Sequence, residues 1–283
     1  MRPPGTTVAP PPGAGNGGTP TKKTEAAVNG FRLPESSSGR GKAIILNAVE
    51  GFGKTSAVAF AEDSALICAP HETGYLTLVE AGIAPARPYV IANTWSELLN
   101  IVKGITPDVK LLALDAIGGF ERLNHENIVK RDFRGEWGEK GFASYQKGYT
   151  QSIPDWMQLI AALDNVRAAG TDVVILGHTK IKTFKNPIGT DYDRYVCDVH
   201  ESTWGVTHKW ADAVLFGNFY QVIEEEKRGR HKGKGGTERV LYTEHRDTWD
   251  AKNRFGMPES IDIPNDPSLV WETICNSMRK AGK

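Results

Sequence analysis

Residues 48–55 restrict the possible folds of this chain more than any other feature. They read Ala-Val-Glu-Gly-Phe-Gly-Lys-Thr, follow directly on the apolar run 43–47, and precede a helical pattern that starts at Ser56. A glycine-rich loop between a buried strand and a helix is the arrangement in which backbone N–H groups surround the phosphates of a nucleotide. The sequence therefore predicts an α/β fold with a phosphate-binding loop at the end of its first strand.

Each position of this loop, called the cradle below, has an expected role in binding Mg-ATP. Lys54 reaches the β- and γ-phosphate oxygens, the Thr55 hydroxyl ligates Mg²⁺, and the helix N-terminus adds its positive end. The first position is alanine where the usual pattern has glycine. The residues expected to contact the nucleotide are Ala48, Val49, Glu50, Gly51, Phe52, Gly53, Lys54, Thr55 and Ser56.

Polar residues at the ends of other expected strands supply the remaining catalytic candidates. Asp115 would hold Mg²⁺ through water, although an aspartate at this junction also suits a helix N-cap. Glu72 is the first candidate for orienting or deprotonating the attacking water, and Glu50 is a weaker one; Glu72 fits a plain surface carboxylate equally well. His178 either contacts the γ-phosphate or bonds to the backbone.

Short apolar runs separated by helical patterns predict a mostly parallel sheet covered by helices on both faces. The expected strands are residues 43–47, 65–69, 89–92, 110–114, 172–177 and 213–216. Residues 94–97 form a capping box, which opens a helix that stops near Gly104. A second helix is expected to follow Ser152, with Gly170 beyond its end. Its apolar stripe is Trp156, Met157, Ile160, Leu163 and Val166.

Composition limits the rest of the molecule. Residues 1–35 hold almost no large apolar side chain and predict a disordered tail rich in Pro and Gly, which leaves residues 36–283 for one ATPase domain. Lys+Arg and Asp+Glu both number 34, so a polyanion would need a local basic patch. The three widely spaced cysteines favour a reducing compartment, the cytoplasm, and no apolar run approaches the ~20 residues of a membrane span.

The order of these pieces resembles the RecA-type ATPase core, here with a C-terminal β-hairpin. The hairpin arms are residues 219–225 and 238–244, joined by the basic stretch 227–236. Segments 172–178, 210–214, 239–246 and 250–258 look more specifically like the phage-encoded, AAA-domain ATPases of single-strand annealing and recombination. The resemblance covers residues 40–263, and its most specific piece is Ala-Lys-Asn-Arg-Phe-Gly at 251–256. Ala48, the long tail and the insert 124–148 depart from it.

The resemblance implies a Mg-ATP hydrolase that binds single-stranded DNA in phage recombination or replication, inside the host cytoplasm. It implies a homo-oligomer, either a ring or a filament, and a single-stranded-DNA-binding protein as a further partner. Arg246 would be the group that reaches the phosphates of a neighbouring subunit, with Lys252 and Arg254 as the next choices.

DNA would be held by two loops, residues 116–154 and 179–207, in which cations alternate with aromatic rings. Solvated charges over packed aromatics are the alternative for either loop. The residues concerned are Lys130, Arg131, Arg134, Lys140, Lys147, Phe133, Trp137, Phe142 and Tyr145 in the first loop, and Lys180, Lys182, Lys185 and Arg194 in the second. The hairpin connection 227–236 either follows phosphate as well or is a soluble turn.

Two other functions remain open from the sequence. One is a P-loop kinase for a small molecule, which would need an arginine-rich lid and an acceptor pocket. The other is a binding module that responds to nucleotide without hydrolysis, in which Glu72 performs no chemistry.

Overall fold

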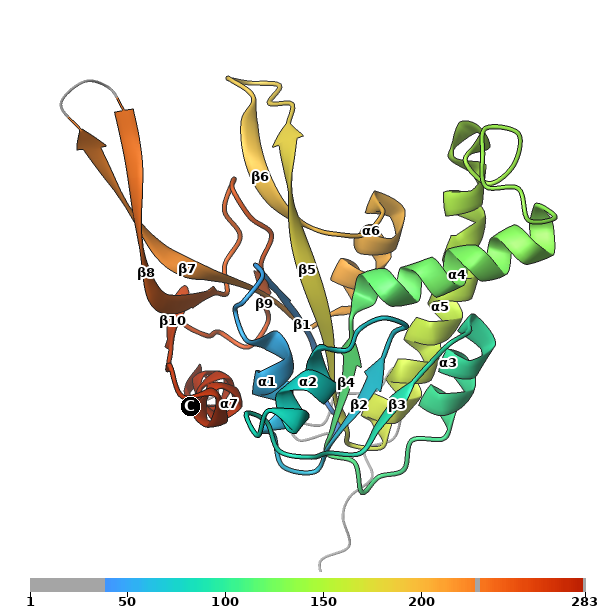
Figure 1. Ribbon diagram of the computed structural model, residues 1–283, viewed down its shortest axis with the longest axis horizontal. Helices are drawn as coiled ribbons and strands as arrows, with labels where there is room; N and C mark the ends of the chain where they lie inside the picture. Colours follow the sequence, from blue (N-terminus) through green and yellow to red (C-terminus); the bar gives the residue numbers. More distant parts are fainter. Residues whose placement is uncertain (1–38, 227–229, 282–283) are drawn as a thin grey trace, which may run out of the picture. The chain divides into compact units, whose positions relative to one another are not determined.

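Ten strands form one sheet in the described part of the chain, and its central strands run parallel. The computed structural model describes residues 39–226 and 230–281, with backbone alone at 221–226, 230–235 and 280–281. The strand order is β10-β8-β7-β1-β5-β4-β2-β3, with β6 beside β5 and β9 beside β7 (Figure 1). The strands are β1 Ala43–Ala48, β2 Ser64–Cys68, β3 Tyr89–Ile91, β4 Leu111–Asp115, β5 Asp172–Phe184, β6 Tyr192–Cys197, β7 Ala213–Glu226, β8 Arg230–Tyr242, β9 Lys252–Asn253 and β10 Ser260–Ile263.

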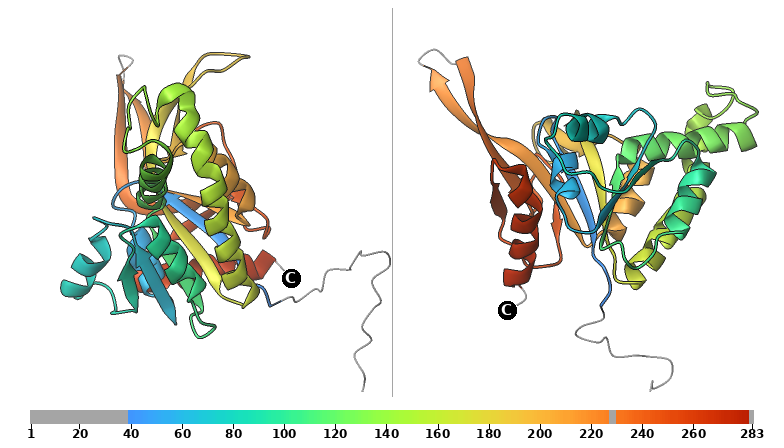
Figure 2. Two further views of the ribbon diagram at one scale, coloured as in Figure 1. Left: turned by 90° about the vertical axis from the view of Figure 1, so that its right-hand side faces the viewer. Right: turned by 60° about the horizontal axis from the view of Figure 1, so that its bottom comes forward.

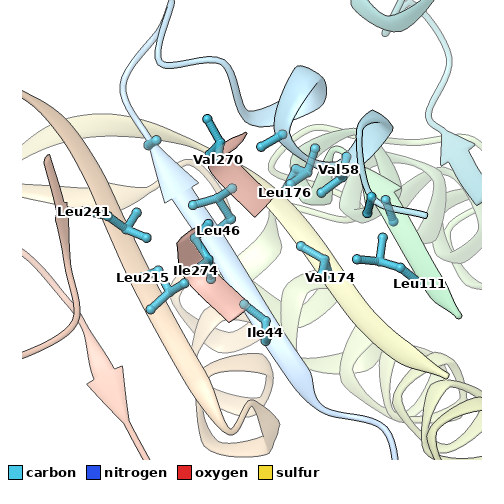
Figure 3. Close-up of a cluster of buried hydrophobic side chains, with 14 of the residues drawn as sticks. Ile44, Leu46, Val58, Leu111, Val174, Leu176, Leu215, Leu241, Val270 and Ile274 are labelled. Carbon is cyan, nitrogen blue, oxygen red and sulfur yellow. The ribbon is translucent and has the colours of Figure 1, made fainter. Parts of the chain in front are cut away.

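Helices cover both faces of this sheet (Figure 2). They are α1 Lys54–Ala59, α2 Gly74–Glu80, α3 Trp95–Lys103, α4 Ile117–Asp132, α5 Lys147–Ala168, α6 Glu201–Trp210 and α7 Val270–Ala281, with short 3₁₀ turns η1 Ser144–Gln146 and η2 Pro267–Leu269. Alternate residues of a strand point to opposite faces. Ile44 and Leu46 of β1 therefore pack with α1 and α7, as Figure 3 shows, while Ile45 packs on the side of α3, α4 and α5. The expected α/β fold, a mostly parallel sheet between helices, is confirmed.

The register of the central strands brings their carboxyl ends to one edge. β1 pairs in parallel with both β5 and β7, so Ala48 lies opposite His178 on one side and Gly217 on the other. β4 pairs in parallel with β2 and β5, which places Asp115 opposite Cys68. A ligand site at this edge is the general rule for parallel α/β sheets.

The sequence placed all six parallel strands and the first of the two helices correctly. Thr94 is the N-cap, as expected, and its side chain accepts from the Glu97 backbone N–H; the Glu97 carboxylate accepts from the N–H of Asn93, one residue before the position that a capping box uses. The second helix, α5, starts at Lys147 instead of after Ser152, because its first turns pack against Phe142. Met157 does not belong to the buried stripe, since it is 45% exposed.

The prediction of two long loops from the sequence is wrong. Residues 116–154 form α4, η1 and the start of α5, because Phe120 and Leu123 of α4 are buried under the sheet and Ile128 packs on Phe142. Residues 179–207 hold the outer half of β5, which pairs antiparallel with β6, followed by α6.

The C-terminal hairpin is present as the antiparallel pair β7 and β8. It is longer than expected, because β8 starts at Arg230, inside the stretch 227–236 that the sequence suggested as a connection. Figure 1 shows the β5–β6 and β7–β8 hairpins extending past the edge where β1 ends. Residues 227–229 and the expected disordered tail 1–35 lie outside the described residues.

The three cysteines are free; Cys68 and Cys197 are buried and Cys275 is partly exposed. Among the helices that the structure describes, none has both the length and the apolar character needed to cross a membrane.

Candidate nucleotide-binding site

The cradle is anchored by a phenylalanine that packs on two very small residues. Phe52 is only 1% exposed, and a Cβ built on Gly217 of β7 would lie 2.7 Å from its ring and 2.8 Å from the Ala48 Cβ. The Val49 N–H donates to the Gly217 carbonyl at 3.1 Å. Alanine at position 48 therefore fits as the last residue of a buried strand, and it keeps room for the anchor.

Two glycines supply the backbone turn of the cradle. Gly51 and Gly53 have φ of 73° and 92°, a region that residues with a Cβ rarely adopt. The second of these directly precedes α1, whose first residue is Lys54. The free N–H groups at this helix start are the donors that phosphate oxygens accept.

Lys54 is folded back onto the cradle. Its Nζ donates to the carbonyl oxygens of Ala48, at 3.0 Å, and Val49, at 3.3 Å. Burial lowers the pKa of Lys54, while Asp115, Glu50 and Glu72 act in the opposite direction. Because these bonds are made to neutral carbonyls, phosphate oxygens can replace them with a gain in charge attraction.

Thr55 and Asp115 meet although 60 positions separate them in the chain. The Thr55 Oγ1 donates to the Asp115 Oδ2 at 2.8 Å. Asp115 is 5% exposed at the end of β4, and burial raises its pKa. Hydroxyl and carboxylate oxygens are the ligands that Mg²⁺ prefers, and a cation would offset the buried charge, so the pair fits that ion. The N-cap of α4 is Ala116, which removes the capping interpretation of Asp115.

Glu72, in the segment that follows β2, lies close to His178 of β5, although β4 separates these two strands in the sheet. The Glu72 Oε1 lies 3.7 Å from the His178 Nε2, an ion-pair distance. His178 lowers the pKa of Glu72, and Glu72 raises the pKa of His178. Lys54 further lowers the Glu72 pKa. The structure thus brings Glu72 and His178 together with Lys54, Thr55 and Asp115; the weaker candidate Glu50 is exposed.

Arg246 lies outside this cluster. Its guanidinium pairs with Glu259 on the surface. The two alternatives differ in kind: Lys252 donates to the last carbonyls around α6, those of His208, Lys209 and Ala211, whereas Arg254 pairs with Asp212. The bonds of Lys252 are those of a helix C-cap, which explains its presence without a nucleotide.

The cations expected to bind DNA fall into two groups. Those of the second predicted loop each pair with a carboxylate: Lys180 with Asp198, Lys182 with Glu201, Lys185 with Asp191 and Arg194 with Asp250. In the first predicted loop, Arg131 pairs with Asp132 and Asp155, and Phe142 is buried. Within the described residues, no carboxylate lies within ion-pair distance of Lys130, Arg134, Lys140 or Lys147.

One residue near the cradle was missed from the sequence. Arg239 of β8 donates from Nη1 to the Phe52 carbonyl at 2.7 Å, and a Cβ on Gly53 would lie 2.8 Å from the same nitrogen. Arg239 and Phe52 are 187 positions apart in the sequence. No spacing rule indicates such a contact, because it depends on how β8 is placed beyond β7.

Comparison with known proteins agrees with this geometry. A family model described as an AAA domain, AAA_24, matches residues 40–255. No curated protein matches the chain.

Three solved structures are similar at low identity. The RadB recombinase is 9% identical with a TM-score of 0.42, covering 81% of this chain and 90% of that one. The flagellar accessory protein FlaH from Methanocaldococcus jannaschii is 10% identical with a TM-score of 0.37, covering 79% and 85%. The KaiC-like protein PH0186 from Pyrococcus horikoshii OT3 is 12% identical with a TM-score of 0.36, covering 81% and 88%. At these scores the three structures carry no functional argument.

The family match spans well over half of the chain and includes the cradle, Glu72, Asp115 and His178. The chain therefore belongs to the AAA_24 family of AAA domains.

Proposed function

We propose that this protein is a Mg²⁺-dependent ATPase that acts on single-stranded DNA in recombination or replication. The observation that carries the proposal is the meeting of a P-loop lysine, a hydroxyl–carboxylate pair and a Glu–His pair at one sheet edge. Each of these groups has a role in phosphoryl transfer, and they come from segments far apart in the sequence.

Lys54 and the cradle bind the phosphates. Lys54 leaves the carbonyls of Ala48 and Val49 and donates to the β- and γ-phosphate oxygens. Thr55 and Asp115 hold Mg²⁺, which when bound offsets the negative charge on the phosphate oxygens.

Glu72 and His178 act on the attacking water. The lowered pKa of Glu72 keeps it ionised at neutral pH, so it accepts a hydrogen bond from water and orients it toward the γ-phosphate. His178 holds the Glu72 carboxylate and stands at the point where β5 leaves the sheet for its hairpin with β6. A change at the phosphate therefore has a direct route to that hairpin.

Arg246 supplies positive charge to the cradle of a neighbouring subunit in a ring or filament. Its guanidinium is exposed and bonds only across the surface to Glu259 in the contacts described, so it is accessible to a second copy. A guanidinium stays charged and can bond two phosphate oxygens at once.

Single-stranded DNA is held chiefly by the α4–α5 tip, which we define as residues 130–147. Its support is the group of cations there that have no carboxylate partner among the described residues, together with Tyr145, which is fully exposed at 101%. Phosphates need cations and unstacked bases need aromatic faces. The resemblance to phage annealing ATPases supports a phage role, a single-stranded-DNA-binding protein as partner, and the cytoplasm as the place.

Phosphate release from Mg-ATP, measured with and without an oligonucleotide, tests the proposal. We expect release that depends on Mg²⁺ and rises with single-stranded DNA. Transfer of phosphate to a small molecule would instead favour a kinase, and ATP binding without release would favour a non-hydrolysing module; either result would overturn the proposal.

A further inference from the structure

A hollow of about 400 Å³ beside the cradle is lined by residues of β7, β8 and β10 and by the two residues that follow β10. Its lining includes Tyr220, Glu238, Arg239, Asp262, Pro264 and Asn265. None of these residues belongs to the phosphate-binding group described above. The volume falls in the range of small-molecule sites, about 300–1,000 Å³.

Arg239 connects this hollow to the cradle. One of its terminal nitrogens donates to the Phe52 carbonyl in the cradle, and the other donates to the Pro264 carbonyl in the hollow. In the described part of the chain no carboxylate pairs with this guanidinium, and partial burial lowers its pKa. An un-neutralised positive charge therefore stands at the junction of the two sites, where it favours an anion.

The other lining groups suit a polar planar ligand. Tyr220 is 53% exposed and offers an aromatic face. Glu238 and Asp262 are exposed carboxylates that accept from hydroxyl or amino groups, and the Asn265 amide both donates and accepts. A ligand that combines a phosphate, hydroxyl groups and a flat ring matches this set of groups.

We propose that the hollow binds the nucleoside part of the nucleotide whose phosphates occupy the cradle. Arg239 gives up one of its hydrogen bonds to a backbone carbonyl and donates instead to the phosphate nearest the sugar. The carboxylates of Glu238 and Asp262 accept hydrogen bonds from the ribose or the base. This inference rests on the proposed nucleotide site, and it adds which part of the protein holds the sugar and base.

Binding of two ligands separates the hollow from the cradle. Mg-ATP and inorganic tripolyphosphate share the phosphates, but only ATP carries a nucleoside. Isothermal titration of the full chain should show ATP binding more tightly. In Asn265→Trp, whose indole fills the hollow, ATP affinity should fall about tenfold while tripolyphosphate affinity stays unchanged. The matched control Asn100→Trp, on an exposed face of α3, should bind both ligands as the wild type does.

Arg239→Gln provides a second variant should the tryptophan disturb folding. Its melting temperature is measured first, and its ATP affinity should fall by at least about fivefold. Unchanged ATP affinity in folded Asn265→Trp or Arg239→Gln would overturn the inference while leaving the cradle intact. Lys54→Ala should weaken both ligands; if the wild type binds neither, the proposed function fails together with the inference.

Discussion

At the scale of single residues, Gly217 is as important for the cradle as the residues of the cradle itself. Gly217→Ala places a methyl group against Phe52 and Ala48, at separations that real Cβ atoms do not adopt. We expect the free energy of unfolding to fall by about 1–3 kcal/mol and ATP affinity to fall with it, because the loop must shift. Thermal melts and ATP titration measure the two effects.

The control for this change is Gly205→Ala in α6, where nothing lies within 4 Å of the new Cβ. That variant should keep its ATP affinity and gain slightly in stability, since alanine favours a helix. If Gly217→Ala behaved like Gly205→Ala, Phe52 would not be the anchor of the cradle.

The Glu72–His178 pair predicts a pH dependence with a definite sign. The pKa of His178 in the folded protein lies above its ordinary 6.5. The stabilisation that comes from protonated His178 is therefore fully present just below pH 6.5, and it is lost as the pH rises through the folded pKa of His178. The folded pKa of Glu72 lies below its ordinary 4.5, so the contribution is also lost as pH falls through that lower value.

Titration of the His178 ring by NMR measures this pairing directly. In Glu72→Gln the ring pKa should move down, because burial and Lys54, which both lower it, then act without the carboxylate. Glu62→Gln, at an exposed position, should leave the ring pKa unchanged. A His178 pKa that is the same in all three proteins would mean that the two side chains do not interact in solution.

At the scale of elements, the sequence predicted the short apolar strands. The strands β1, β2 and β4 are buried along their whole length, so each appears in the sequence as an apolar run, and the cap of α3 has a local signature. The sequence did not predict α4, because its buried face includes the polar residues Asn124 and His125, which interrupt the helical spacing of apolar residues. It also contains Gly119, required where a Cβ would lie 2.3 Å from that of Ala69. The close approach of a helix to a strand end cannot be predicted from the spacing of residues along the sequence.

The contrast between the α4–α5 tip and the β5–β6 hairpin gives a prediction for DNA. Replacing Lys130, Arg134, Lys140 and Lys147 with alanine should reduce affinity for a fluorescent oligonucleotide by at least about tenfold and flatten its salt dependence. Replacing Lys180, Lys182 and Lys185 should have a smaller effect, because carboxylates already pair with them. Anisotropy at low and physiological salt measures both. A larger loss in the hairpin variant, or binding that ignores salt, would contradict the assignment.

At the scale of the whole molecule, the contacts that matter most join distant segments. The Arg239 bond to Phe52 and the Thr55 bond to Asp115 depend on the order of strands in the sheet. The sequence indicated the second because both partners stand in recognisable motifs at strand ends. It did not indicate the first, because Arg239 stands in no motif and its position follows from the pairing of β8 with β7.

Assembly gives the prediction at this scale. If Arg246 acts on a neighbouring subunit, ATPase activity per subunit should rise with protein concentration, and Arg246→Ala should lose that rise while still binding ATP. A Lys54→Ala subunit keeps its Arg246, and an Arg246→Ala subunit keeps its cradle. Mixing the two inactive proteins should therefore restore part of the activity. No recovery at any ratio, with assembly confirmed by light scattering, would exclude Arg246 and turn attention to Arg254.

The central claim, that the cradle binds and hydrolyses ATP, is tested most directly by phosphate release from Mg-ATP by wild type and Lys54→Ala. The account predicts a loss of at least about 100-fold, because Lys54 is the cation that meets the transferred phosphate. Lys103→Ala, an exposed lysine at the end of α3, should retain the wild-type rate, and melting curves should show all three proteins folded. A folded Lys54→Ala protein that hydrolyses ATP at the wild-type rate would contradict the account.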